Sequence, residues 1–99
     1  MIRNANVILV DRATADQLNA VHEIVKTHAS GWWHHFTSVW IVGGEKTATQ
    51  WRNLISPVIT EGAANVLVLE LPPPEADRLW AFYGKKPEER SKWLHDSYK

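Results

Sequence analysis

Two neighbouring histidines, His34 and His35, lie in an aromatic and β-branched stretch that reads GWWHHFTSVWIV over residues 31–42. Imidazole is the side chain that most readily gains or loses a proton near neutral pH, so each histidine is a candidate general acid or base. Successive side chains of a strand point to opposite faces, so the two rings would not hold one metal ion together. The alternative for each is a hydrogen-bonded histidine packed beside tryptophan in a sheet.

Three tryptophans of the same stretch, Trp32, Trp33 and Trp40, are candidate stacking surfaces. A nucleobase that stacks on an aromatic ring gains about 1–3 kcal/mol, whatever the base. The alternative is that one indole fills the core while another lies in a subunit interface, where tryptophan is enriched. Cationic side chains would add phosphate contacts, and the candidates are Arg12, Lys46 and Arg52. The predicted ligand-binding set is Trp32, Trp33, His34, His35, Trp40, Arg12 and Lys46.

Asp11 follows the apolar run 7–10 and is a candidate metal ligand at the end of a buried strand. Carboxylate oxygens suit hard cations, so two copies of Asp11 across a dimer are candidates for holding Mg²⁺. The alternative is that Asp11 caps the turn into the following helix. The chain has no cysteine, which excludes thiolate chemistry, and no serine lies in a nucleophile-elbow motif.

The 99 residues carry 11 Lys and Arg against 11 Asp and Glu, so the formal net charge is zero. Affinity for long nucleic acid rests on phosphate neutralisation, so this balance favours a compact nucleotide held by a few donors. No apolar run reaches the roughly 18 residues that span a bilayer. Asp11 and Arg12 interrupt the first apolar run, unlike the core of a signal peptide. We expect one cytoplasmic domain without membrane contact.

Several short elements must position these side chains. The capping-box pairs Thr14/Gln17 and Thr47/Gln50 predict two helix starts, and Pro57 disfavours helical geometry at the residue before it. Apolar residues at helical spacing predict helices, whereas unbroken apolar runs predict buried strands. The aromatic stretch predicts a hairpin that reverses at residues 36–38. The predicted order is strand 6–10, helix 15–28, strands 32–35 and 39–42, a helix begun at Thr47 and ended near Pro57, and strand 65–71.

This β-α-β-β-α-β order predicts a ferredoxin-like α+β sandwich. Right-handed crossovers would put both helices on one face of the sheet, and the other face must be covered by the tail, a second copy or a ligand. We expect residues 1–71 to form this core. Residues 72–99 are predicted to be a C-terminal aromatic extension that packs on the core or on a dimer partner. Within it, Pro72–Pro74 would end the sheet, residues 75–83 would make one irregular helical turn, and Trp93 and Leu94 would lie in a short last helix.

The block Trp32-Trp33-His34, followed by Ser38–Val42, resembles the small bacterial and phage proteins called SinR-like. The likeness extends over Val7–Asp11, Val66–Leu71 and the tryptophans of the tail. Those proteins are similar in fold to the CRISPR-associated small endoribonucleases and to the virulence-associated D proteins. The resemblance implies a homodimer and a metal-binding aspartate at the end of the first strand, which is the place of Asp11.

Three functions follow as hypotheses, and they leave open whether the chain is an enzyme. The first is a homodimeric nucleotide- or nucleic-acid-binding module, for a nucleotide or a single strand, with aromatic and histidine pockets near the hairpin. The second is a metal-dependent endoribonuclease centred on Asp11 with Mg²⁺. The third is a phage or bacterial regulatory protein that sequesters or blocks a host partner. Zero net charge ranks nucleotide binding first.

Overall fold

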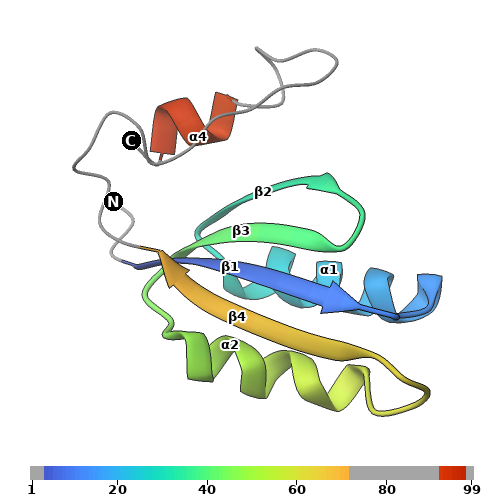
Figure 1. The fold of residues 1–99 in the computed structure, drawn as a ribbon. Coiled ribbons are helices and arrows are strands. Elements are labelled where there is room, and N and C mark those ends of the chain that lie inside the picture. The colour runs from blue at the N-terminus through green and yellow to red at the C-terminus, as the bar shows by residue number, and fades with distance from the viewer. Residues whose placement is uncertain (1–3, 72–91, 98–99) are drawn as a thin grey trace.

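The computed structural model describes residues 4–71 and 92–97 (Figure 1). The predicted helix over 15–28 and strand over 65–71 are confirmed with those bounds, and the first strand is longer than predicted. The predictions for residues 72–91 lie outside the described residues. The elements are β1 (Asn4–Asp11), α1 (Ala15–His28), β2 (Gly31–Phe36), β3 (Val39–Gly44), α2 (Ala48–Ile55), the 3₁₀ turn η1 (Ser56–Val58), β4 (Asn65–Leu71) and α4 (Lys92–Ser97).

The four strands form one antiparallel sheet in the order β2-β3-β1-β4, so the fold is α+β. The predicted hairpin is confirmed, with a tighter reversal at residues 37–38 because Phe36 still belongs to β2. The register of β2 against β3 shifts between Trp33 and Phe36, whereas β1 pairs with β4 without a shift from Ala5↔Leu71 to Asp11↔Asn65. The two edges of the sheet, β2 and β4, are therefore different.

Both long helices pack on the same face of the sheet, hereafter the helix face (Figure 1). Alternation along the strands sends every second side chain to this face. Trp40 of β3 is fully buried there, and α1 and α2 add one apolar stripe each. Burial of apolar surface at about 25 cal/mol per Å² is the main stabilising contribution of this layer. The buried cluster is Ile8, Val10, Val21, Val25, Trp40, Val42, Trp51, Ile55 and Ile59.

Side-chain hydrogen bonds fix where both helices begin. The two predicted capping boxes are present, with Thr14 Oγ1 accepting from the Gln17 amide at 3.1 Å and Thr47 Oγ1 accepting from the Gln50 amide at 3.2 Å. Asn6, buried in β1, donates from Nδ2 to the Lys46 carbonyl at 3.1 Å. That bond ties the loop before α2 to the centre of the sheet, so the start of α2 is held beside β4.

The other face of the sheet, hereafter the open face, is covered at one side only. Trp33 of β2 is buried there, and Trp93 of α4 lies so close to Gly31 that a Cβ on Gly31 would be 2.5 Å from its Nε1. Toward β4, by contrast, Leu67 and Leu69 are 56% and 48% exposed. The helix α4 therefore leaves the β1–β4 side of the open face in contact with solvent.

Candidate functional site

An aromatic and imidazole cluster lies where α1 crosses the β2–β3 hairpin. His34 stacks on Trp40 with ring centroids 4.2 Å apart and an interplanar angle of 4°. His22 of α1 approaches the other members, with its centroid 5.0 Å from that of His34 and 6.2 Å from that of Trp32. Side chains of β2 alternate between the two faces, as predicted. Trp32 and His34 lie on the helix face, whereas Trp33 and His35 lie on the open face.

Hydrogen bonds assign the protons of the two clustered imidazoles. Trp40 Nε1 donates to His22 Nδ1 at 3.1 Å, so the neutral His22 ring carries its proton on Nε2. The Val39 carbonyl only accepts, and it lies 2.9 Å from His34 Nδ1, so His34 carries a proton on that nitrogen. The second nitrogen of each ring is left for solvent or a ligand.

Electrostatics favour the neutral form of His22. Burial lowers the pKa of His22 below its ordinary 6.5, and the neighbouring His34 and Lys26 lower it further. Glu23 acts weakly in the opposite direction. A neutral His22 imidazole could donate a hydrogen bond from Nε2 to a ligand. Within residues 4–71 and 92–97 no three His, Cys, Asp or Glu side chains gather as a metal site would need.

The predicted stacking residues differ in what they offer a ligand. Trp40 is 0% exposed and Trp33 is 4% exposed, so neither presents a ring face to solvent. Trp32 is 36% exposed on the helix face, and Phe36 is exposed at the end of β2. The stacking role predicted for the tryptophans therefore falls to Trp32. His35 lies beside Trp33 on the open face, with ring centroids 5.3 Å apart.

The predicted cations do not join this cluster as one set. Arg12 follows β1 at the hairpin end of the sheet, where the Val10 amide bonds the Ser38 carbonyl. Lys46 lies at the opposite end, because Asn4 pairs with Gly44 there. The two cations therefore lie at opposite ends of the strands, too far apart to bind one small phosphate group.

Asp11 is the last residue of β1, as predicted, and its carboxylate is exposed. Its Oδ2 lies 3.5 Å from Arg12 Nε, and its strand partner is Asn65. The N-cap of α1 is Thr14, as predicted, and Asp11 lies just before the turn that leads to it. Arg12 itself makes the turn with a left-handed φ of 60°.

A second candidate site is the uncovered part of the open face. Leu9 pairs with Leu67, and Val7 pairs with Leu69, so apolar side chains lie in cross-strand pairs on β1 and β4. Sequence alternation alone could have grouped these residues. It could not show which face the helices cover, and Glu70 was the only sign of a solvated end. Glu70 is indeed exposed, on the helix face with the half-buried Val66 and Val68.

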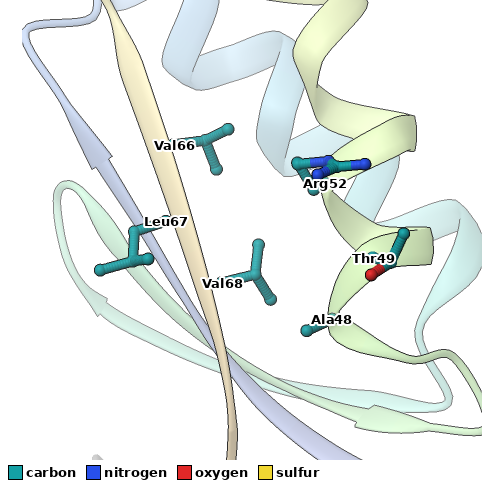
Figure 2. A pocket seen from close by; sticks show the side chains of 6 residues that line it. All are labelled: Ala48, Thr49, Arg52, Val66, Leu67 and Val68. Carbon is teal, nitrogen blue, oxygen red and sulfur yellow. The ribbon is translucent and has the colours of Figure 1, made fainter.

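A groove of about 230 Å³ runs between the edge strand β4 and α2 (Figure 2). Figure 2 shows Arg52 of α2 beside Val66, and Ala48 beside Val68, so the helix runs opposite to the strand. Arg52 was predicted as a phosphate contact, and its position beside a strand edge was not foreseeable from its neighbours in the sequence. The lining residues are Ala48, Thr49, Arg52, Val66, Leu67 and Val68.

Comparisons of this chain with protein-family models, with curated protein sequences and with solved structures found no match. The resemblance to SinR-like proteins therefore stays a prediction. In the described part of the chain the longest helix has 14 residues, and none has the length and apolar character needed to cross a bilayer.

Proposed function

We propose that this chain is a protein-interaction module that works as a homodimer, with a ferredoxin-like split βαβ fold. The strand order counted from the other edge, β4-β1-β3-β2, supports that fold, as does the position of α1 and α2 on one face. The function rests on one observation, the exposed leucines of the open face.

Leu67 and Leu69 are about half exposed, and Leu9 beside them is 36% exposed. Single exposed leucines are ordinary on protein surfaces, but neighbouring ones on a flat sheet face mark an interaction site. Removing such surface from water is favourable by about 25 cal/mol per Å². The α4 side of the same face already has its cover, so a partner gains most by packing on β1 and β4.

The chemistry of the open face favours a protein over a nucleic acid. Its uncovered β1–β4 half presents aliphatic side chains, which offer bases no aromatic ring for stacking. No Lys or Arg belongs to the described strands β1–β4, so phosphates would find no cation on the strands themselves. An apolar protein surface needs neither a stacking ring nor a cation to bind here.

Sedimentation equilibrium tests the proposal. The wild-type chain is expected to form a dimer, and the double variant Leu67→Gln/Leu69→Gln is expected to sediment as a monomer with an unchanged circular dichroism spectrum. Phe36→Gln is the matched control, because Phe36 is equally exposed but lies at the end of β2 against Trp33. A wild-type chain that stays monomeric at every concentration overturns the proposal.

The aromatic cluster supports a second candidate function, the binding of a nucleotide at Trp32. Its half-exposed indole lies beside His22, and Lys26 follows one helical turn later on α1. A base stacked on Trp32 would place its phosphates near that lysine. A nucleotide is expected to raise the melting temperature of the wild type but not of Trp32→Ala, and no change in the wild type would contradict this function.

A further inference from the structure

The two edges of the sheet are protected to different degrees. The edge strand β2 has a register shift, which twists a strand away from neighbours, and α4 packs against it. In the described part of the chain the edge strand β4 has no such shift, because it pairs evenly with β1 over its whole length. The helix packed beside it, α2, leaves a groove along the strand. The β4 sequence NVLVLEL contains no proline or lysine and only one charge, Glu70. Such an edge is a template for another strand.

The charges beside this edge are arranged at opposite ends. Arg52 lies at the Val66 end of the groove, as Figure 2 shows, and Glu70 lies four residues further along the same strand. Both side chains are exposed. Within the described residues neither forms an ion pair, and the Arg52 guanidinium donates only to Asn53 Oδ1.

We propose that a second copy of this chain pairs antiparallel along β4, about a two-fold axis through Val68. This inference rests on the proposed homodimer and names its geometry. An antiparallel pair centred on Val68 sets Val66 opposite the partner's Glu70. The partner's carboxylate then enters the helix-face side of the groove beside Arg52, and symmetry makes the same contact twice. A single two-fold axis thus gives both exposed charges, Arg52 and Glu70, an oppositely charged partner.

The same register also brings the exposed leucines of the two β4 strands together. Leu67 lies opposite the partner's Leu69 on the open face, so each subunit covers part of the other's exposed apolar surface. The two sheets become one continuous eight-stranded sheet. In this dimer the two Asp11 carboxylates are about 25 Å apart, because three strand spacings and six residues along the strand separate them. This dimer therefore does not build a paired Asp11 metal site.

Engineered cysteines test the register directly, because the chain has no cysteine of its own. In the proposed dimer the two Val68 Cβ atoms face each other at about 4.5–5.5 Å, near the range of a disulfide. The two Val66 positions are about 14 Å apart, because four residues along the strand and one strand spacing separate them. Val68→Cys is expected to cross-link on mild oxidation, whereas the matched control Val66→Cys, on the same strand and face, is expected to stay uncross-linked. Equal cross-linking of the two variants overturns the register.

A charge exchange tests the pairing of Arg52 with the partner's Glu70. Arg52→Glu and Glu70→Arg are each expected to raise the dimer dissociation constant about tenfold, because each places like charges together twice. The double variant is expected to restore the wild-type value. A monomeric wild type overturns the proposed function, whereas a dimer that neither reversal weakens overturns the β4 geometry alone.

Discussion

Replacing Trp40 with phenylalanine isolates the contribution of the indole at the centre of the aromatic cluster. Trp40 is fully buried, its Nε1 donates to His22 Nδ1 at 3.1 Å, and its ring stacks on His34 at 4.2 Å. Trp40→Phe keeps an aromatic ring against His34. It removes the donor and leaves space where the larger ring system lay.

The expected decrease in the free energy of unfolding follows from the lost hydrogen bond and the lost ring atoms. A neutral hydrogen bond contributes about 0.5–1.5 kcal/mol to stability. The lost ring atoms add transfer and cavity costs of about 1–2 kcal/mol. We expect Trp40→Phe to lower the free energy of unfolding by about 2–3 kcal/mol, a large fraction of the 5–15 kcal/mol typical of a domain. In a chain of this size the melting temperature falls by about 10–20 °C.

Urea unfolding at pH 8, followed by circular dichroism, measures this loss while His22 is neutral. Trp32→Phe is the matched control, since it makes the same chemical change on the neighbouring strand at a half-exposed ring without a hydrogen bond from its Nε1 to His22. We expect it to cost less than about 1 kcal/mol. A cost below about 0.5 kcal/mol for Trp40→Phe, or an equal cost for the control, would contradict the role assigned to the Trp40 indole.

Three further outcomes follow from the described contacts. The pKa of His22 in the folded chain lies below its unfolded value of about 6.5, so the unfolded chain binds more protons between those two pH values. The urea midpoint of the wild type should therefore fall as the pH is lowered from about 6.5. In His22→Gln the midpoint should depend less on pH over the same range. Gly31→Ala should loosen α4, since the new Cβ meets Trp93, and hydrogen exchange of residues 92–97 should quicken; unchanged exchange contradicts this contact. Asn6→Ala should cost about 1–2 kcal/mol through its part-buried bond to a loop carbonyl. Asn4→Ala, whose hydrogen bond is exposed, should cost less than about 0.5 kcal/mol in the same unfolding assay.

Local chemistry made the helix starts predictable. The pairs Thr14/Gln17 and Thr47/Gln50 predict the starts of α1 and α2, because each capping box is complete within four residues. Pro57 likewise ended α2, leaving only a 3₁₀ turn beyond Ile55. These signals depend on neighbours along the chain, so the sequence contains all of them.

The faces of the hairpin were not predictable in the same way. Alternation groups Trp32 with His34, yet only the register of β2 against β3 and the path of α1 decide which pair meets the core. The approach of His22 to Trp40 joins residues 18 positions apart, and the proximity of Arg52 to Val66 depends on how α2 crosses the sheet. Such contacts arise from packing between elements, which no single segment encodes.

Hydrogen exchange of the wild-type chain at increasing protein concentration tests the central claim, that a second copy pairs with β4. Amides of residues 65–71 that point away from β1 are expected to become protected as concentration rises, while those of residues 31–36 in the opposite edge strand keep constant rates. Exchange in residues 65–71 that does not change with concentration, in a chain that stays monomeric, would contradict the account.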